Sequence, residues 1–309
     1  MPERSVPSSM LAGYFFAIAA TALWSGNFIV ARGLNESIPP ISLAFWRWVV
    51  AVVVFLPFAA KRLIDEWCTI REHLRYLSVT AFVGITLFNM FIFYAAHTTT
   101  AMNLSLIAIS SPIFIVIFSR ILFQELITFK KGAGIILVLA GVLLLISKGT
   151  LSILLDISFA IGDIWMLAAS ILFAVYSILV KQKPKQLSIS AFQLATFILG
   201  LIFLFPFFIW EHATTPSVVF DTAIVASILY VGIFASLSAF VLWHRSICII
   251  GPSKAGMIYY TLPVFSGISA YFFLNEAISM IHFYSVLLIV SGIVITNHEA
   301  KKVSVGVHP

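Results

Sequence analysis

Ten stretches of apolar residues, each close to the length that crosses a lipid bilayer, dominate this sequence. A hydrocarbon core about 30 Å thick is crossed by about 20 residues of α-helix. Only helices and closed barrels pair their backbone groups in lipid, and continuous apolar runs lack the alternating pattern of a barrel. We therefore predict an all-α membrane protein with ten transmembrane helices. The expected spans are Leu11–Arg32, Pro40–Ala60, Leu74–Ala96, Ala101–Phe118, Lys131–Ser147, Ile161–Val180, Ser190–Trp210, Thr222–Trp243, Ser253–Phe273 and Ile281–Thr296.

The composition excludes a water-soluble domain, because 61% of the residues are hydrophobic and only 10% are charged. Ordinary globular chains are about 25% charged. The net charge of +6 suggests nucleic acid at first, but the cations stand in short clusters between apolar runs, so we expect no nucleic-acid partner. Cys68 and Cys248 lack metal-ligand spacing, so we expect no disulfide, metal or other cofactor. The expected partners are the lipid bilayer and a small-molecule substrate, and the protein is a monomer or a homodimer.

The Lys and Arg residues predict the orientation of the chain, because cytoplasmic loops are enriched in these residues. With the N-terminus inside, every Lys and Arg lies on the cytoplasmic side except Arg32 and Lys148, which lie outside, and Arg47 within the second span. Both termini are therefore expected in the cytoplasm. The first apolar run could also be a signal peptide. We interpret it as a retained helix, because Leu11–Arg32 is long enough to span and has a counterpart in the second half.

The sequence contains one unit twice. Ser111–Phe114 matches Leu262–Phe265, 151 residues later, and Ala19–Trp24 matches Ala168–Phe173, 149 residues later. Two copies of one folding unit therefore make up the chain.

We divide the chain into a first five-helix repeat, residues 1–150, and a second five-helix repeat with the C-terminal tail, residues 151–309. Five spans is an odd number, so the second copy enters the membrane from the face opposite to the first. The repeats are thus expected to be inverted. In many membrane carriers, inverted repeats exchange two equivalent arrangements and expose a central site to each side in turn. The repeat therefore predicts transport by alternating access.

Four segments resemble the EamA family of the drug/metabolite transporter superfamily, and the resemblance extends from about Gly13 to Thr296. It implies a ten-helix fold whose central cavity is lined largely by spans one to four and six to nine. It also implies a bacterial inner-membrane protein that transports small polar or amphipathic metabolites, often exporting amino acids as the YddG-like members do. The segments are ALWSGNFIVAR in span one, FWRWVVA in span two, SSPIFIVIFSRILFQE in span four and TLPVFSGISAYFFLNE in span nine.

Arg47 is the clearest candidate for substrate binding, because a charge eight residues inside a span is costly and normally faces protein or water. Its guanidinium could hold a substrate carboxylate through two parallel hydrogen bonds. Alternatively, Arg47 pairs with helix carbonyls or a polar neighbour and holds the spans together. Both interpretations stay open at this point.

Other polar and aromatic residues within the spans are further candidates for the cavity wall. Asn and Tyr offer hydrogen bonds, and aromatic faces offer stacking or cation-π contacts. An amide in an apolar stretch needs a partner. The tyrosines also suit interfacial belts or helix packing. The candidates are Trp24, Asn27, Asn89, Tyr94, Tyr176, Tyr259 and Tyr260.

Lys254 and its repeat equivalent Asn103 are candidates for a second anion anchor or an inner gate. The lysine could instead extend to the cytoplasmic headgroups. Pro112 and Pro263 interrupt spans four and nine at matching places, where they would act as kinks or hinges. Small residues in spans five and ten predict close helix contact, namely Gly132, Gly134, Gly141, Ser285 and Gly292.

Several residues near span ends are expected to have structural roles. Glu125, Glu276 and Asp163 suit helix N-termini, so we interpret them as caps and not as proton carriers. No Asp or Glu is predicted deep in any span, which favours facilitated diffusion or exchange over proton coupling. The membrane interface is the expected place of the remaining set, Trp46, Trp48, Trp165, Trp210, Trp243, His244 and Arg245.

Other function classes fit less well. An intramembrane enzyme would need a catalytic constellation, and the sequence has no HExxH, no GxSxG and no paired carboxylates inside the membrane. A receptor would not need the duplication, whereas a channel could also use inverted repeats. Arg47 favours a carboxylate and the aromatic residues favour an apolar side group, so amino acids fit both. Organic cations or drugs are the alternative substrates, because an aromatic cage would suit them.

Overall fold

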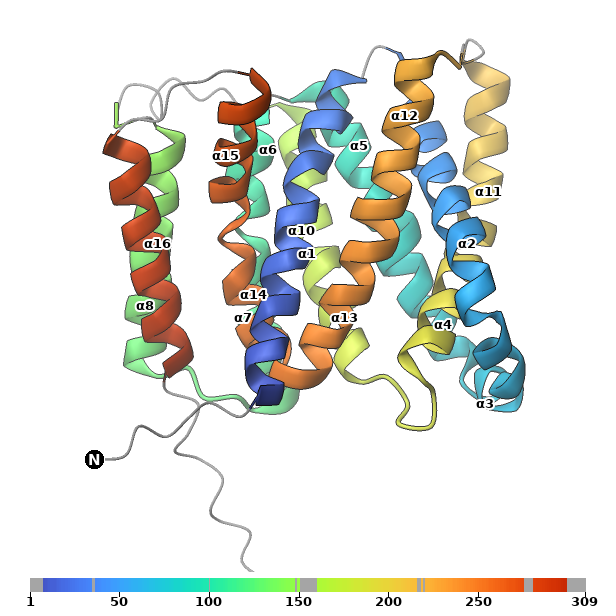
Figure 1. The fold of residues 1–309 in the computed structure, drawn as a ribbon, viewed down its shortest axis with the longest axis horizontal. Coiled ribbons are helices and arrows are strands. Elements are labelled where there is room, and N and C mark those ends of the chain that lie inside the picture. The colour runs from blue at the N-terminus through green and yellow to red at the C-terminus, as the bar shows by residue number, and fades with distance from the viewer. Residues whose placement is uncertain are drawn as a thin grey trace, which may run out of the picture.

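The computed structural model describes residues 8–34, 37–99, 101–147, 149–150, 160–215, 218, 220–274 and 280–298. Lys148 and Glu276, which the sequence analysis uses, lie outside these residues. The described chain is almost entirely helical and contains no β-strand, and most of its helices stand side by side across the height of one bundle (Figure 1). The prediction of an all-α fold is confirmed.

The helices of each half follow the same order. Those of the first half are α1 (Ser8–Gly33), α2 (Pro40–Asp65), α3 (Trp67–Glu72), α4 (Leu74–Ala81), the π-helix η1 (Phe82–Leu87), α5 (Phe88–Thr98), α6 (Ala101–Ala108), α7 (Ser111–Phe123) and α8 (Phe129–Ile146). Those of the second half are α10 (Ile161–Lys181), α11 (Ile189–Thr214), α12 (Thr222–Tyr230), the π-helix η2 (Val231–Ser238), α13 (Ala239–Ile250), α14 (Pro252–Tyr259), α15 (Leu262–Leu274) and α16 (Met280–His298).

Within the described residues, nine helical stretches are long and apolar enough to cross a membrane. They correspond to the expected spans one to eight and ten. The place of the ninth is taken by α14 and α15, two shorter helices separated by a turn at Tyr260–Thr261. The expected number of exactly ten spans is therefore not confirmed: nine stretches of the described residues meet the length and composition of a span, and the fourth of them is itself divided between α6 and α7.

Pro112 and Pro263 begin new helices, in the first turns of α7 and α15. A proline is tolerated there because the first-turn N–H groups have no partner within the helix. In the turn before each proline, a hydroxyl donates a hydrogen bond to a carbonyl of the preceding helix. The Ser110 Oγ donates to the Ile107 carbonyl oxygen over 2.6 Å, and the Thr261 Oγ1 donates to the Ile258 carbonyl oxygen over 2.7 Å. The structure interrupts both spans just before these prolines, as expected, and their role as kinks or hinges stays a prediction.

The two halves run in opposite directions. Helices α1 and α8 begin at one end of the bundle, whereas their counterparts α10 and α16 begin at the other (Figure 1). Apart from Arg32 and Arg47, every Lys and Arg of the described residues belongs to the end where α1 begins. We call this the basic end, and the other the opposite end. The predicted inversion is therefore present in the fold.

Helices α8 and α16 form a closely packed pair at the edge of the bundle (Figure 1). A Cβ atom at Gly134 would lie 2.7 Å from the Gly292 carbonyl oxygen, and one at Gly141 would lie 2.9 Å from the Ser285 carbonyl oxygen. Gly134 is equivalent to Ser285 and Gly141 to Gly292, each 151 residues apart, so this contact maps onto itself when the repeats are exchanged. The close approach predicted from small residues is confirmed here, but not at Gly132, where a Cβ would meet nothing within 4 Å.

We expect Gly134→Ala to lower the melting temperature of the purified protein in detergent. The new Cβ would meet both the Gly292 backbone and, at 2.1 Å, the Thr296 Oγ1. Overpacking of this kind costs about 1–3 kcal/mol. Gly132→Ala is the matched control on the same helix, where removing a glycine favours the helix by about 0.5–1 kcal/mol. Equal melting temperatures for the two variants would contradict this account of the helix pair.

Both repeats contain a π-helix in the same place. The tripeptide Val-Gly-Ile occurs at residues 83–85 in η1 and at 231–233 in η2, 148 residues apart. π-Helical turns are rare and are often found at functional sites. A π-helical turn contains one residue more than an α-helical turn, and this changes the direction in which its side chains point. In η2, the Ser236 hydroxyl donates to the Val231 carbonyl five residues earlier, over 2.9 Å. In the first repeat, Asn89 follows η1 and donates its amide back to this π-helix over 2.8 Å.

Side-chain caps begin several helices. The Thr128 Oγ1 accepts a hydrogen bond from the Lys131 backbone N–H over 3.2 Å and so caps α8. The expectation that Glu125 caps this helix is wrong, because Glu125 lies before Thr128 and its Oε2 is 3.4 Å from the Lys131 Nζ. The Asp163 Oδ2 accepts from the Ala160 N–H over 2.8 Å, which confirms its expected role as a cap of α10.

Three residues expected at the membrane interface are buried inside the bundle. Trp48 and Trp243 are fully buried, with ring centroids 5.1 Å from Phe240 and 5.3 Å from Trp24, respectively. His244 is also buried. The interface prediction is wrong for them because it used their position along each span, whereas the face of the helix on which they lie decides their environment.

Candidate functional site

A small cavity lies between the two repeats. Its volume is about 20 Å³, which is room for about one water molecule. A metabolite therefore does not fit while the helices keep this arrangement. The lining residues come from α1, α2, α5, α10, α13 and α14, and they are Trp24, Asn27, Arg47, Phe88, Asn89, Ile92, Phe173, Phe240 and Tyr259.

Equivalent positions of the two repeats meet at this cavity. Trp24 and Phe173 are 149 residues apart, and their ring centroids lie 5.5 Å from each other. Ile92 and Phe240 are 148 residues apart, the spacing of the two π-helices, and both line the cavity. The pseudo-two-fold relation between the repeats therefore centres on this cavity, as it does in carriers built from inverted repeats.

Arg47 is the one charged residue of the cavity wall, and it is only 2% exposed. Its Nε donates to the Ser236 Oγ over 2.6 Å, and its Nη1 donates to the Asn27 Oδ1 over 3.1 Å. Its guanidinium carbon also lies 5.5 Å from the centroid of the Phe93 ring. These contacts come from three different helical segments, so they hold the guanidinium in one orientation.

The positive charge of Arg47 has no carboxylate within ion-pair distance among the described residues. Its Nη2 likewise makes no hydrogen bond to any of them. A buried cation without an opposite charge is costly, and such residues in membrane proteins mark substrate or ion pathways. The bonds to Ser236 and Asn27 are those expected of a residue that holds spans together, whereas Nη2 donates to none of the described residues.

Trp24 is at the centre of the aromatic part of the wall. Its Nε1 donates to the Ala235 carbonyl oxygen over 2.9 Å, which satisfies the indole inside the bundle. Four rings pack around it with centroids 5.3 to 5.9 Å away, those of Phe173, Phe240, Trp243 and Tyr259. Such a wall offers an apolar surface that a substrate side group can contact.

Half of the residues that the sequence nominated for substrate binding line this cavity. They are Arg47, Trp24, Asn27, Asn89 and Tyr259. Their binding role stays a prediction.

Two of the other nominated residues lie in the helix packing outside the cavity. The Tyr176 hydroxyl is buried and hydrogen-bonded to the His244 Nε2. Tyr260 belongs to a separate hydrophobic cluster with residues of α8 and α16, including Val138 and Ile289. The sequence did not separate these tyrosines from Tyr259, because all three stand among apolar residues that mark no single buried face.

The remaining nominated residues lie near the two ends of the bundle. Tyr94 packs with its ring centroid 6.2 Å from Trp165. Asn103 donates to Asp163 near the opposite end. Lys254 lines a second pocket at the basic end. The structure therefore does not bring these residues to the central cavity in this arrangement.

A buried carboxylate joins the two repeats at the opposite end. Asp163 of α10 is 5% exposed and accepts from the Thr99 Oγ1 over 2.5 Å. The Asn103 Nδ2 donates to both of its oxygens, over 3.1 and 3.0 Å. Because Thr99 and Asn103 belong to the first repeat, Asp163 ties the turn between α5 and α6 to α10.

A second carboxylate, that of Glu211, joins α11 of the second repeat to α2 of the first. Glu211 is 3% exposed, and it accepts from the backbone N–H of Ile41 over 2.9 Å and from that of Ser42 over 2.6 Å. The Ser42 hydroxyl adds a third bond over 2.8 Å. Glu211 thus supplies the cap that α2 lacks in its own sequence. We call the contacts of Asp163 and Glu211 the opposite-end latches.

Sequence reasoning missed several residues of this site. Phe88 and Ile92 are ordinary apolar span residues, and nothing local marks them. Phe173 carried a usable signal, because it is the repeat equivalent of Trp24. Ser236 and Glu211 act on partners far away in the chain, so no local pattern could identify them.

Comparison with known proteins agrees with this architecture. Residues 11–147 and 160–298 each match the EamA-like transporter family. An uncharacterized transporter of Archaeoglobus fulgidus is 31% identical over 281 residues, which cover 89% of this chain and 93% of the relative. The uncharacterized transporter YetK of Bacillus subtilis is 25% identical, covering 94% of this chain and 88% of the relative.

A solved crystal structure shares the fold, with a TM-score of 0.75 at 22% identity, covering 97% of this chain and 100% of the other. The twofold match, the multi-pass helical bundle and the two inverted repeats therefore lead to one assignment. The chain belongs to the EamA-like transporter family.

Proposed function

We propose that this membrane transporter is a secondary carrier that exports small carboxylate-bearing metabolites, with amino acids as the best-fitting class, by alternating access through the central cavity. The observation that carries the proposal is the buried Arg47 with no carboxylate partner among the described residues. A substrate carboxylate would supply the missing opposite charge. Its two oxygens suit the planar donor geometry of a guanidinium.

The other lining residues support this substrate class. The Asn27 and Asn89 amides stand beside Arg47 as polar groups that can contact an amino group, and the rings around Trp24 suit an apolar side group. Nucleotide sugars and phosphate esters would need more cations than the single one in this cavity wall. An organic cation would have to bind beside Arg47, and two like charges about 4 Å apart repel by roughly 1–4 kcal/mol.

The small volume of the cavity supports alternating access. At about 20 Å³ the cavity is closed to a metabolite, so the helices must separate at one end before a substrate enters. The opposite-end latches join the two repeats at one end. A hydrogen bond from the Lys131 Nζ to the Ser253 Oγ, over 3.2 Å, joins them at the other. Breaking one set while the other holds would expose the cavity to one side at a time.

The positions of Asp163 and Glu211 support exchange or facilitated diffusion. Each is a buried acidic residue that the helix boundaries place near a span end, and each accepts at least three hydrogen bonds. Neither lines the central cavity. A proton-driven carrier usually needs a titratable relay within the membrane.

Counterflow in proteoliposomes tests the proposed function. Vesicles loaded with unlabelled phenylalanine or leucine are expected to accumulate the radiolabelled amino acid transiently, because a carrier exchanges substrate across the membrane while a channel does not. Accumulation should be the same with and without a pH gradient. Empty vesicles and vesicles loaded with choline are the controls.

Two outcomes would change the proposal. Counterflow of choline without counterflow of any amino acid would replace the substrate class. A strict requirement for a pH gradient would replace facilitated exchange with proton coupling.

A further inference from the structure

A second pocket, much larger than the central cavity, lies at the basic end of the bundle. Its volume is about 400 Å³, within the range of about 300–1,000 Å³ that is usual for ligand pockets. It lies where the linker between α7 and α8 meets the start of α14 and the end of α16. Its lining residues are Phe123, Gln124, Glu125, Leu126, Thr128, Lys131, Ile250, Ser253, Lys254, Met257, Thr296 and Asn297.

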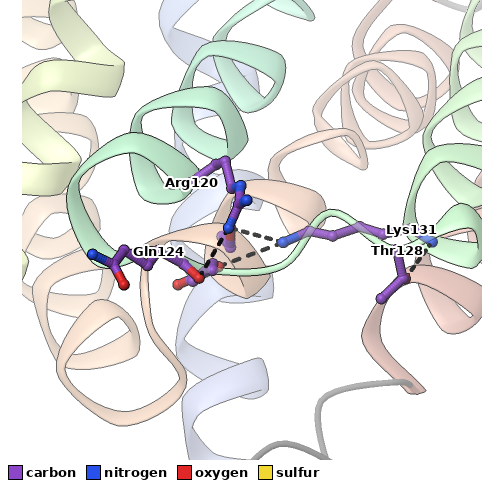
Figure 2. Close-up of polar contacts among 6 residues, drawn as sticks. Arg120, Gln124, Thr128 and Lys131 are labelled. Carbon is purple, nitrogen blue, oxygen red and sulfur yellow. Dashed lines mark hydrogen bonds and ion pairs between the residues drawn. The ribbon is translucent and has the colours of Figure 1, made fainter.

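Two lysines are among the described residues that line this pocket. Lys131 extends from the first turn of α8 toward the linker (Figure 2), where its Nζ lies 3.4 Å from the Glu125 Oε2 and 3.2 Å from the Ser253 Oγ. Lys254 contributes a second ammonium group to the wall. Glu125 is the one acidic residue that the described part of the chain contributes to this wall.

The start of α14 adds to the positive potential. Gly251 precedes this helix with a φ of 82°, and no side chain caps it. Pro252 follows as the first helical residue. The first N–H groups of a helix have no acceptor within the helix, and they form the positive end of its dipole. Ser253 and Lys254, which belong to this first turn, line the pocket, so anions are favoured there.

The remaining wall of the pocket is apolar. Phe123, Leu126, Ile250 and Met257 line it. Leu126 is 53% exposed, and Phe129, next to the lining residue Thr128, is 91% exposed. A soluble anion would gain nothing from these side chains. A lipid would place its acyl chains against them.

We infer that this pocket binds the headgroup of an anionic glycerophospholipid. The phosphate lies between Lys131, Lys254 and the start of α14, and the acyl chains leave over Leu126 and Phe129. The pocket is at the helix ends that carry the Lys and Arg residues, which is the depth of the headgroups on the cytoplasmic face in the predicted orientation. Basic pockets between transmembrane helices on that face suit anionic headgroups.

Native mass spectrometry of the full-length protein tests this site. Protein is released from mixed micelles that contain equal amounts of phosphatidylglycerol and phosphatidylcholine. We expect the wild type to retain phosphatidylglycerol selectively and Lys131→Gln/Lys254→Gln to bind it about thirtyfold more weakly. Lys130→Gln/Lys181→Gln is the matched control, because these two exposed lysines lie at the same end outside the pocket and remove the same charge.

Melting temperatures provide an independent readout. Phosphatidylglycerol should stabilise the wild type and the control variant, and should stabilise the pocket variant much less. Inorganic phosphate should not reproduce the effect. Equal retention of phosphatidylglycerol by the pocket and control variants would overturn the site, and equal stabilisation by inorganic phosphate would overturn its assignment to lipid. If the Gln variant does not fold, Lys131→Arg/Lys254→Arg decides, since loss of selective retention despite the kept charge would refute the inference.

Discussion

Arg47→Ala is expected to reduce amino-acid counterflow at least a hundredfold. Ser236 and Asn27 hold the guanidinium, and in the proposed function its Nη2, which donates to none of the described residues, binds a substrate carboxylate. Breaking a buried charge pair by removing one partner costs about 3–5 kcal/mol, and each 1.4 kcal/mol is about a factor of ten. Arg47→Lys should recover little of the loss, because an ammonium group lacks the planar pair of donors. Initial rates in proteoliposomes with equal amounts of folded protein measure the effect.

Two further variants separate binding from helix packing. Arg245→Ala is the charge control, because Arg245 is an exposed arginine outside the cavity, with its guanidinium 5.8 Å from the Phe16 ring. It should transport at the wild-type rate. Ser236→Ala removes the contact that Arg47 makes with the second repeat and leaves the charge in place. If Ser236→Ala and Arg47→Ala lower the melting temperature and transport equally, Arg47 holds the repeats together and does not bind substrate.

Asp163→Asn is expected to open the central cavity to the side of the opposite end. The substitution keeps the shape of the side chain but removes the charge to which Thr99 and Asn103 donate. Hydrogen bonds to a charged group contribute about 1.5–3 kcal/mol each, so weakening two of them should shift the opening equilibrium at least tenfold. The shift in the opening equilibrium should exceed that caused by substituting a residue whose contacts all lie within one repeat.

In the predicted orientation the opposite end faces the outside of the cell, so thiol labelling of whole cells measures this opening. The two native cysteines, Cys68 and Cys248, are replaced by serine, and Ile92→Cys places one thiol in the cavity wall. A membrane-impermeant thiol reagent should then react with the thiol introduced at position 92. The reaction should be at least ten times faster in the Asp163→Asn background than in the same protein with Asp163 in place. Asp221→Asn is the matched control, because Asp221 also begins a helix at the opposite end but caps only its own helix, through the Ile224 N–H at 2.7 Å. Equal labelling rates with and without Asp163→Asn would exclude Asp163 as a latch.

Much of the fold was predictable because a membrane constrains each segment locally. Backbone groups in lipid must be paired within their own helix, so the length of an apolar run is nearly sufficient to predict a span. The duplication added the inverted arrangement, since repeats with an odd number of spans must enter from opposite faces. Arg47, Asn27 and Asn89 were predictable for a similar reason, because polar groups in a span must face protein or water. All three line the cavity.

What only the tertiary structure decided is which residues meet. The spans are apolar on every face, so the helical period that marks a buried face in a soluble protein is absent, and Tyr259 could not be separated from Tyr176 or Tyr260. Pairing across the chain was equally hidden, because Glu211 caps a helix that begins about 170 residues earlier. The sequence by itself determined the helices, the presence of two repeats and the inversion of the second repeat, since these depend on the solvent around each segment. The cavity wall, the latches and the lipid pocket depend on how the helices rotate against one another, and that is set by packing between distant segments.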